Sequence, residues 1–187
     1  MPSKFLSPLD IENIRKFFQI PHLEIELRTT WGSTHPGFRE ELHGDLKKKM
    51  AKAYPFSDSS IAHCRSLGGF AFSQYDSDHV ISLGFDIEED ERVTKEVAVR
   101  ICKTAQEYAF APSNASLWTA KEACFKALKG AKQPPTVSGL ELEKWEKWDS
   151  QTETVCLKDS RNFNYSSVKG LILKKTPYSF AFFIAFP

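Results

Sequence analysis

Apolar and polar residues recur along the chain in patterns that predict strands. Residues 22–28 ("HLEIELR") alternate apolar and charged side chains, which is typical of a strand with one buried face. The stretch "YSFAFFIAFP" (178–187) is apolar at odd and even positions alike. Both faces of such a strand need cover, so we expect it to be the central strand of a sheet. A turn at Lys175-Thr176-Pro177 should join it to the strand that precedes it.

Three other segments have the spacing and the end signals of helices. Ser7-Pro8-Leu9-Asp10 is a typical helix start, and Pro21 should follow the end of that helix. A second helix should run from about residue 94 to residue 109, and a third from 113 or 114 to 130. The first helix has a predicted buried stripe of Leu9, Ile14, Phe17 and Phe18. The stripe of the third is Leu117, Ala120, Ala123, Cys124, Ala127 and Leu128.

The remaining strand candidates decide the fold class. Residues 68–74 and 79–88 flank Tyr75-Asp76-Ser77-Asp78, and this arrangement predicts a hairpin. Residues 140–148 fit a strand or a helix equally well. The order of helix, strand, hairpin, helices and a final hairpin indicates the α+β class.

Composition and charge narrow the class of protein. The chain has 187 residues, enough for one good-sized domain or two lobes that share a core. Its 25 basic and 24 acidic side chains give a net charge of +1, whereas a dedicated nucleic-acid binder would carry a clear basic excess. We therefore expect no nucleic-acid partner.

The cysteines and the apolar tracts bear on location. The four cysteines are widely spaced and form no C-x-x-C pair, so neither a zinc site nor a disulfide framework is expected. The first residues are too polar for a signal peptide. The most apolar tract is about half as long as a bilayer-spanning helix. These features indicate a reduced, cytoplasmic protein without a membrane partner.

Candidate chemistry begins where an apolar strand ends in carboxylates. Asp86 and Glu88 lie two residues apart in "GFDIEED", so a strand would point both to the same face. Two such anions about 4 Å apart repel by roughly 4 kcal/mol at an effective dielectric of about 20. A basic side chain, a raised pKa or a metal ion has to compensate this repulsion.

The third helix carries a second polar group of residues. Trp118, Glu122 and Lys126 are spaced four apart on one flank, with Lys121 beside them and off the core stripe. Taken alone, Glu122 and Lys126 are best explained as a surface ion pair. A lone D-x-E at a strand end is likewise more often a turn or helix-capping acid than a metal site.

Together the two groups resemble the motifs of the 4′-phosphopantetheinyl transferases. Gly84–Glu88 matches G-x-D-x-E, and Trp118–Lys126 matches W-x-x-K-E-x-x-x-K. The segments "SSIAHCR" (59–65) and "KTAQEYAF" (103–110) also match. The order of these motifs is similar to that of the surfactin-synthetase-activating type.

That resemblance implies a fold and an organisation. The type has two similar α+β halves in one chain, related by a pseudo-two-fold arrangement, and acts as a monomer. Here the halves would be residues 1–80, on the side of the coenzyme A 3′-phosphate, and residues 81–187, on the side of the metal and pyrophosphate. They would form one compact catalytic unit, with a first half that is trimmed because the chain is short for this type.

The resemblance also implies a reaction. A serine hydroxyl of an apo acyl or peptidyl carrier protein would attack the β-phosphate of coenzyme A, take the 4′-phosphopantetheine group and release 3′,5′-ADP. This is a Mg²⁺-dependent holo-acyl-carrier-protein synthase activity of the kind that serves fatty acid biosynthesis. Oxygen ligands and a diphosphate are what Mg²⁺ prefers.

Site residues follow from the matched positions. By resemblance, the metal ligands are Asp86, Glu88 and Glu122. The motif lysines are Lys121 and Lys126, and Lys121 would contact pyrophosphate oxygens as a point charge.

The resemblance assigns three more residues. His63 would contact the 3′-phosphate, and Glu107 would be the general base. Ala62 and Cys64 stand where the family usually has serines, and Arg65 would compensate for the missing hydroxyl donors. A run of lysines before these residues could bind phosphate or an acidic carrier protein, although a solvated helix face is the favoured explanation: Lys47, Lys48, Lys49 and Lys52.

Two alternatives stay open. A metal-dependent phosphodiesterase or nuclease could also use strand acids with a glutamate and lysine. A non-catalytic coenzyme A-binding relative would keep the fold and the contacts without turnover.

Overall fold

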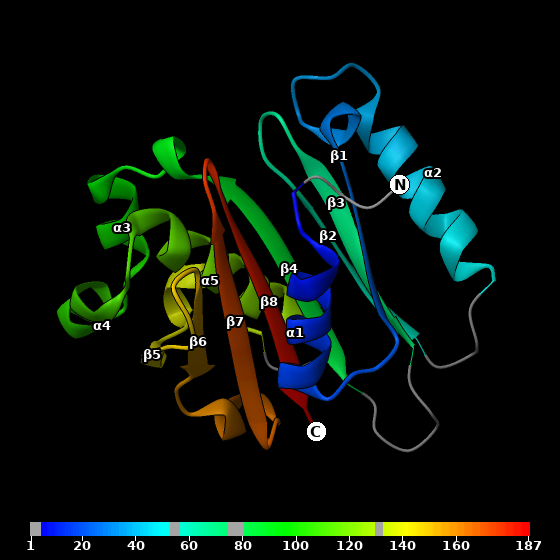
Figure 1. The fold of residues 1–187 in the computed structure, drawn as a ribbon. Coiled ribbons are helices and arrows are strands. Elements are labelled where there is room, and N and C mark those ends of the chain that lie inside the picture. Colours follow the sequence, from blue (N-terminus) through cyan, green and yellow to red (C-terminus); the bar gives the residue numbers. More distant parts are fainter. Residues whose placement is uncertain (1–4, 53–56, 75–80, 130–132) are drawn as a thin grey trace.

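The computed structural model describes residues 5–52, 57–74, 81–129 and 133–187, and these form two antiparallel sheets with helices around them (Figure 1). The three-stranded sheet has the order β1-β3-β2 and consists of β1 (Leu23–Arg28), β2 (Ser57–His63) and β3 (Gly68–Gln74). The five-stranded sheet has the order β4-β8-β7-β6-β5. Its strands are β4 (Ser82–Glu89), β5 (Leu142–Lys147), β6 (Thr152–Leu157), β7 (Ser167–Lys175) and β8 (Tyr178–Phe186). The α+β class is confirmed.

Strand β8 lies between β4 and β7 and is apolar on both faces, as its sequence predicts. Phe180, Phe182 and Ile184 join the core that the N-terminal segments share. Ala181, Phe183 and Ala185 face the opposite core. The two-sided cover explains why residues 180–186 of this strand are all apolar.

Helices cover both sheets. Helix α1 (Pro8–Phe18) begins at a Ser7 cap as predicted and buries Ile14 and Phe18, but Leu9 is 67% exposed, contrary to the prediction. Helix α2 (Phe38–Met50), which follows the short η1 (Thr29–Trp31), packs on the three-stranded sheet. Helix α5 (Asn114–Ala127) begins at a Ser113 cap and packs on β4 and β8. The predicted stripe of α5 is fully buried.

The predicted hairpin of residues 68–74 and 79–88 is wrong. Strand β3 pairs with β1 and β2, whereas β4 pairs with β8, for example Phe85 opposite Phe182. The two phenyl rings stack at a centroid distance of 4.8 Å. Apolar β8 therefore pairs with β4 in place of β3, the strand that precedes β4 in the sequence. The predicted turn residues 75–78 lie outside the described residues.

The predicted helix over residues 94–109 is two short helices, α3 (Lys95–Ile101) and α4 (Ala105–Phe110). Cys102 has an extended backbone that ends α3. The Thr104 hydroxyl then accepts a hydrogen bond from the Glu107 backbone N–H and caps α4. The ambiguous residues 140–148 contribute strand β5, and the predicted helix end at Gly130 lies outside the described residues. The other short helices are η2 (Asp90–Arg92), η3 (Val137–Gly139) and η4 (Ser160–Phe163).

The two sheets meet edge to edge where β2 lies beside β4. The backbone N–H of Leu83 donates to Asp58 Oδ2 at 2.7 Å, and that of Phe85 donates to Ser60 Oγ at 2.9 Å. Side chains of β2 thus satisfy backbone donors of an edge strand, in place of a continuous ladder. We call this contact the β2–β4 seam.

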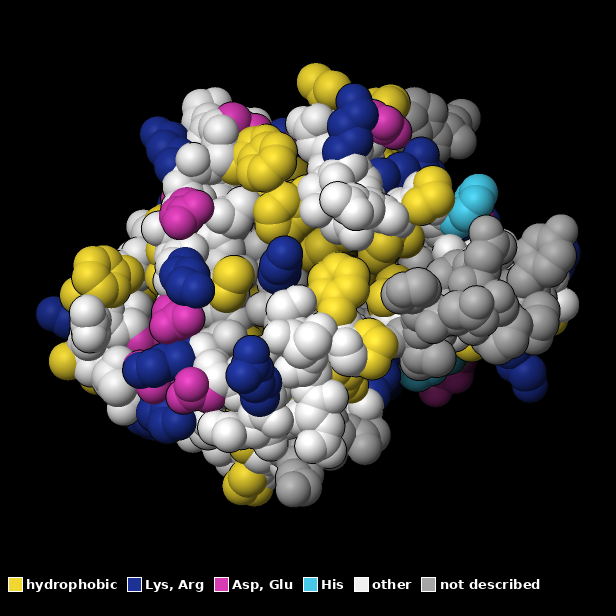
Figure 2. Space-filling model, turned by 90° about the horizontal axis from the view of Figure 1, so that it is seen from below, with side chains coloured by type: hydrophobic (Ala, Val, Ile, Leu, Met, Phe, Trp, Pro, Cys, Tyr) yellow, Lys and Arg dark blue, Asp and Glu magenta, His cyan; other side chains and the backbone are white. Residues whose placement is uncertain are grey.

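The surface and the helices add two general findings. On the face that Figure 2 shows, basic and acidic side chains are interspersed, in keeping with the net charge of +1. None of the helices in the described part of the chain combines the length and hydrophobicity that crossing a membrane requires.

Candidate active site

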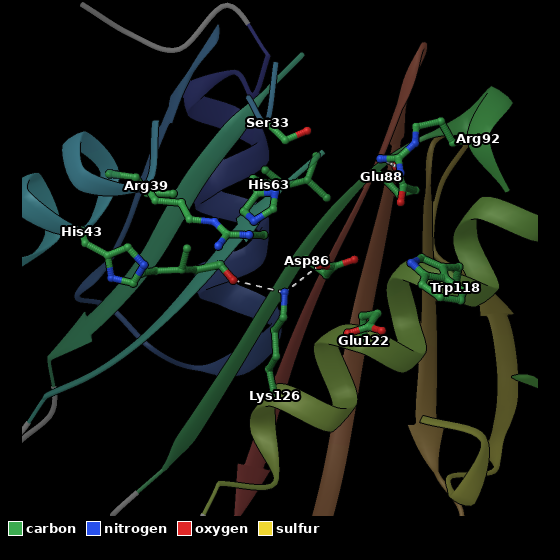
Figure 3. Close-up of a pocket in the computed structure, with 14 residues that line it drawn as sticks. Ser33, Arg39, His43, His63, Asp86, Glu88, Arg92, Trp118, Glu122 and Lys126 are labelled. Carbon is green, nitrogen blue, oxygen red and sulfur yellow. Dashed lines mark hydrogen bonds and ion pairs between the residues drawn. The ribbon is translucent and has the colours of Figure 1, made fainter. Parts of the chain in front are cut away.

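A cleft of about 450 Å³ lies at the β2–β4 seam, between α2 and α5 (Figure 3). Its lining separates into two walls of different charge. The α2 and β2 wall presents Arg39, His43 and His63. The wall formed by β4, η2 and α5 presents Asp86, Glu88, Arg92, Trp118, Glu122 and Lys126.

Gly84 explains why the two sequence motifs share this cleft. A Cβ atom at this position would lie 1.8 Å from the carbonyl oxygen of Ala123 on α5. Only glycine allows β4 to pack so closely against the helix. This contact brings Asp86 on β4 beside Glu122 and Lys126 on α5.

Asp86 is buried, with only 6% of its surface exposed. Its Oδ1 lies 2.7 Å from the Nζ of Lys126. Burial raises the pKa of Asp86 to about 7, Lys126 opposes this rise, and the negative charges of Glu122 and Glu88 add to it. Lys126 thus supplies a basic partner for Asp86, and the pKa of Asp86 is raised as well.

Lys126 also joins the two sides of the seam. Its Nζ donates to the carbonyl oxygens of Ile61 on β2, at 3.1 Å, and Phe85 on β4, at 3.2 Å. Figure 3 shows the side chain reaching from α5 to this point. The ammonium group lies at the centre of the cleft.

Glu88 has a cationic partner of its own. Its Oε1 lies 3.1 Å from Arg92 Nη1 and accepts a hydrogen bond from the Glu89 backbone N–H. Burial is the main cause that raises the pKa of Glu88, and Arg92 opposes it. Within the described residues, Glu122 takes part in no hydrogen bond or ion pair, although its charge acts on both other acids.

The expected metal ligands line one cleft but do not converge. In the described part of the chain, no group of three or more His, Cys, Asp or Glu side chains is arranged to hold a metal ion. The cause is visible in the geometry, because Lys126 holds Asp86 and Arg92 holds Glu88. Three carboxylates suit Mg²⁺ by their chemistry. Their role as ligands stays a prediction.

The cationic wall contains one predicted residue and two that the sequence interpretation missed. The His63 ring packs edge-on against Phe38 at 4.8 Å, and partial burial and the charges of Lys126 and Arg39 lower its pKa. Arg39 and His43 line the same wall from one face of α2. Their spacing of four residues was a signal, but it gained meaning only once α2 was placed beside β2.

Other predicted cations lie away from the cleft. Arg65 is exposed and is not among the cleft-lining residues, whereas its backbone carbonyl accepts hydrogen bonds from Thr34. On the lysine run, Lys48 pairs with Asp45 at 2.8 Å and Lys49 pairs with Glu24. These pairs favour the explanation of that run as a solvated helix face.

Comparison with known families decides what kind of protein contains this cleft. The family model described as the 4′-phosphopantetheinyl transferase superfamily matches residues 82–182, just over half of the chain. The chain belongs to this superfamily. The comparison with curated proteins gave no match. The surfactin-synthetase-activating type stays a prediction.

The match covers one wall of the cleft. It runs from the start of β4 into β8 and includes Asp86, Glu88 and the α5 motif. Helix α2 and strand β2, which carry the other wall, precede it. Membership in the superfamily indicates a transferase of phosphopantetheine, which uses coenzyme A.

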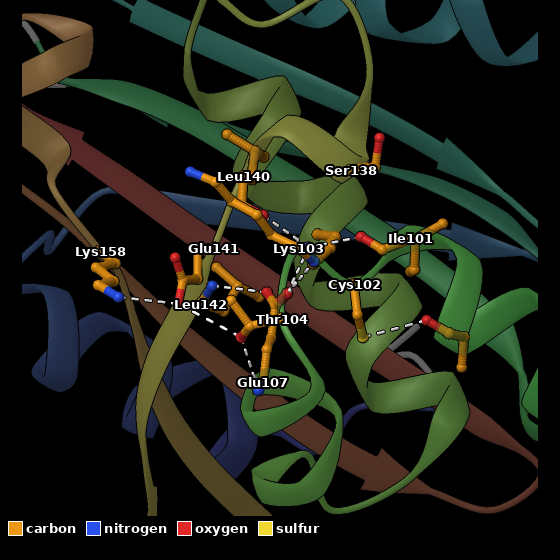
Figure 4. Close-up of polar contacts among 12 residues, drawn as sticks. Ile101, Cys102, Lys103, Thr104, Glu107, Ser138, Leu140, Glu141, Leu142 and Lys158 are labelled. Carbon is orange, nitrogen blue, oxygen red and sulfur yellow. Dashed lines mark hydrogen bonds and ion pairs between the residues drawn. The ribbon is translucent and has the colours of Figure 1, made fainter.

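Two residues with roles expected from the family motifs lie elsewhere in this superfamily member. Lys121 was expected beside Glu122 and off the core stripe, yet its side chain is 0% exposed. It pairs with Glu107, which is equally buried, and neither residue lines the cleft. The cause is that the α3–α4 junction and the start of β5 cover this side of α5 (Figure 4).

Proposed function

We propose that the protein transfers 4′-phosphopantetheine from coenzyme A to a serine of an apo acyl or peptidyl carrier protein. One observation carries this proposal: a single cleft presents two buried acids with basic partners on one wall and an arginine with two histidines on the other. Coenzyme A has a 3′-phosphate and a pyrophosphate that need separate neutralisation. A cleft with charge of both signs suits such a ligand better than a uniformly basic groove does.

The cationic wall would bind the 3′-phosphate. His63, Arg39 and His43 face the cleft from β2 and α2 and together offer hydrogen-bond donors to phosphate oxygens. An anion there would favour protonation of His63 and so oppose the lowering of its pKa. Phosphate binding and protonation of this wall would therefore be coupled.

The opposite wall would bind the pyrophosphate. Asp86, Glu88 and Glu122 would hold Mg²⁺, which when bound neutralises charge on the phosphate oxygens. Lys126 and Arg92 would turn from the carboxylates to phosphate oxygens as point-charge and fork donors, respectively. Trp118 lies one helical turn before Glu122 and would border the path of the pantetheine arm.

The transfer itself forms one P–O bond and breaks another. The serine oxygen attacks the β-phosphorus, the bond from that phosphorus to the bridging oxygen breaks, and 3′,5′-ADP leaves with the electron pair. The hydroxyl proton has to leave at this end of the cleft. Glu122 lines the cleft and is not engaged by a cation among the described residues, and it would accept this proton through the carboxylate oxygen that does not hold Mg²⁺. Positioning and charge neutralisation supply most of the acceleration in such transfers.

The proposal extends to organisation. We propose that residues 1–80 form the 3′-phosphate side and residues 81–187 the metal and pyrophosphate side. A monomer would suffice, because one chain supplies both walls. The cysteines at positions 64, 102, 124 and 156 are free, which supports a reducing, cytoplasmic location.

The test is an intact-mass assay of an apo carrier protein incubated with the protein, coenzyme A and Mg²⁺. We expect one serine to gain a single phosphopantetheine group. Omission of Mg²⁺, with a chelator present, and the Asp86→Ala variant should each abolish the gain. Absence of modification with fatty-acid, polyketide and peptide carrier proteins alike would contradict the proposal.

A coenzyme A-binding relative without turnover is the second candidate. The observation that favours it is the occupation of Asp86 by Lys126 and of Glu88 by Arg92. Such a protein would show a rise in Tm with coenzyme A but no change in carrier mass. The same two assays therefore separate the two candidates.

A further inference from the structure

A buried ion pair behind the cleft has no place in the reaction just described. Lys121 Nζ lies 2.9 Å from Glu107 Oε2, and both side chains are 0% exposed. We call these two residues the internal pair. Charged side chains are almost never fully buried unless they are paired, so their environment indicates what they do.

All three ammonium protons of Lys121 are engaged. One faces Glu107, and the other two are donated to the carbonyl oxygens of Ile101 and Leu140, each at 2.7 Å. Ile101 ends α3, and Leu140 precedes β5. Lys121 would have to give up one of these bonds to contact a phosphate.

Both carboxylate oxygens of Glu107 are engaged as well. Oε2 accepts from the Lys103 backbone N–H at 2.8 Å, and Oε1 accepts from the Leu142 backbone N–H at 2.7 Å (Figure 4). Because the side chain is wholly enclosed, the hydroxyl group of a protein substrate cannot reach it. A general base must come within hydrogen-bond distance of the proton that it removes.

We propose that the internal pair is a positioning element that holds α5, and through it the cleft residues Glu122 and Lys126. The pair joins three segments that are separate in the sequence: the α3–α4 junction, the start of β5 and the middle of α5. This inference rests on the proposed function, since the cleft is taken as the site of transfer. Glu107 and Lys121 are positioning residues, and neither is the base or a phosphate ligand.

The test uses Glu107→Gln, Lys121→Gln and the double variant. Each single variant leaves one buried charge without its partner, and we expect a Tm lower by about 10 °C. We also expect kcat/KM for transfer to fall about 100-fold, because α5 moves relative to β4. The double variant is neutral again and keeps amide donors and acceptors. It should recover to within about tenfold of the wild-type kcat/KM, with a wild-type pH profile.

A matched control separates positioning from general destabilisation. Ile14 on α1 is fully buried in the other core, so Ile14→Ala should also lower Tm. All variants are assayed at a temperature where they are folded. There Ile14→Ala should keep the wild-type KM for coenzyme A, whereas each single variant of the internal pair should raise it.

A double variant that regains stability but stays as inactive as Glu107→Gln would overturn the proposal, because a chemical role needs the carboxylate itself. Equal KM values in Ile14→Ala and the single variants would also overturn it.

A second readout depends on neither transfer nor variants. In the wild-type protein, the backbone amides of Lys103 and Leu142 should exchange with solvent as slowly as the central amides of α5. Fast exchange of these two amides would show that the internal pair does not lock the segments together, even if transfer is never observed. Failure of the transfer assay with slow exchange would count against the proposed function alone.

Discussion

Two lysines of α5, five residues apart, form ion pairs of opposite kinds. Lys121 is fully enclosed, and every bond it makes is to a segment that packs behind the helix. Lys126 keeps 28% of its side chain exposed and reaches into the cleft, where its partner Asp86 has a pKa raised to about 7. All hydrogen bonds of the Lys121–Glu107 pair are made within the protein. In the Lys126–Asp86 pair, a bound cation could replace Lys126 or a bound anion could replace Asp86. One helix thus carries both a fixed support and an exchangeable contact.

The difference in burial predicts that removing Lys121 lowers the free energy of unfolding more than removing Lys126 does. Removing one partner of a buried, hydrogen-bonded pair costs about 3–5 kcal/mol, because the other charge stays buried. Removing Lys126 should cost less, about 1 kcal/mol, because the buried Asp86 carboxyl that remains can be neutralised by a proton. Variants of the two lysines should therefore separate clearly in stability.

The largest effect is expected at the internal pair. Lys121→Met removes the ammonium and leaves the Glu107 carboxylate with two backbone donors, so the free energy of unfolding should fall by about 3–5 kcal/mol. Urea unfolding at pH 7 measures this loss. A loss below about 1 kcal/mol would mean that Lys121 contributes no more to stability than a surface lysine does, and the proposed difference between Lys121 and Lys126 would be wrong.

The second effect concerns Asp86 and depends on pH. Its pKa is about 7 in the folded protein against an ordinary value of 3.8, so the buried charge increasingly disfavours the folded state as pH rises between these values. Asp86→Asn does not titrate. Its stability relative to the wild-type protein should therefore increase from pH 4 to pH 7 and stay constant above. The gain is at most about 4 kcal/mol, at about 1.4 kcal/mol for each tenfold change in protonation.

Thermal unfolding of the apo protein across pH 4 to 8.5 checks this effect. Asp10, whose carboxylate pairs with Lys175 at 2.8 Å, offers a control of opposite sign, because its pKa is lowered. Asp10→Asn should be less stable than the wild-type protein by an amount that stays constant across this pH range, because Asp10 titrates below its ordinary pKa of 3.8. A difference between Asp86→Asn and the wild-type protein that does not change with pH would mean that Asp86 is an ordinary, hydrated carboxylate.

A smaller stability effect is expected for Lys126→Met. Asp86 can take up a proton when its cationic partner is removed, so the loss should be about 1 kcal/mol at pH 6. Binding of coenzyme A should weaken at the same time, because a phosphate donor is lost. Urea unfolding and a coenzyme A titration together test the separation of stability from binding.

The smallest effect is expected for Lys129→Met. Lys129 pairs with Asp58 at 3.1 Å, is 42% exposed, and does not line the cleft. It lies just after α5 and is matched to Lys126 in type and in having an aspartate partner. Its replacement should change stability by less than about 1 kcal/mol and leave coenzyme A binding unchanged. Weakened binding would extend the site beyond the residues proposed.

Local sequence patterns predicted the features of this fold that neighbouring residues determine, namely helix caps and strand faces. The Ser7 and Ser113 caps follow from side-chain hydrogen bonding to the next turn, and the two apolar faces of β8 follow from its apolar residues at odd and even positions alike. The two motifs line one cleft, for which Gly84 supplies the physical reason, but their three carboxylates do not converge as the expected metal site requires.

Features that depend on distant segments escaped prediction. Helical spacing places Lys121 beside Glu122, but residues 101–103 and 140–142 decide that it is buried. The partner of β4 is β8, which lies almost a hundred residues further along the chain, so the local turn signal at 75–78 was misleading. Arg39 and His43 joined the site because β2 and β4 meet side by side. For Lys121 and β4 the local sequence contains no signal of these contacts, and the spacing of Arg39 and His43 is meaningful only once their helix is placed.

The most direct test of the transfer cleft compares the two matched lysines in the carrier-protein mass assay. We predict that wild-type protein and Lys129→Met modify the carrier serine at equal rates, and that Lys126→Met is slower by at least about 100-fold. Equal rates for Lys126→Met and the wild-type protein would contradict the assignment of this cleft as the site of transfer.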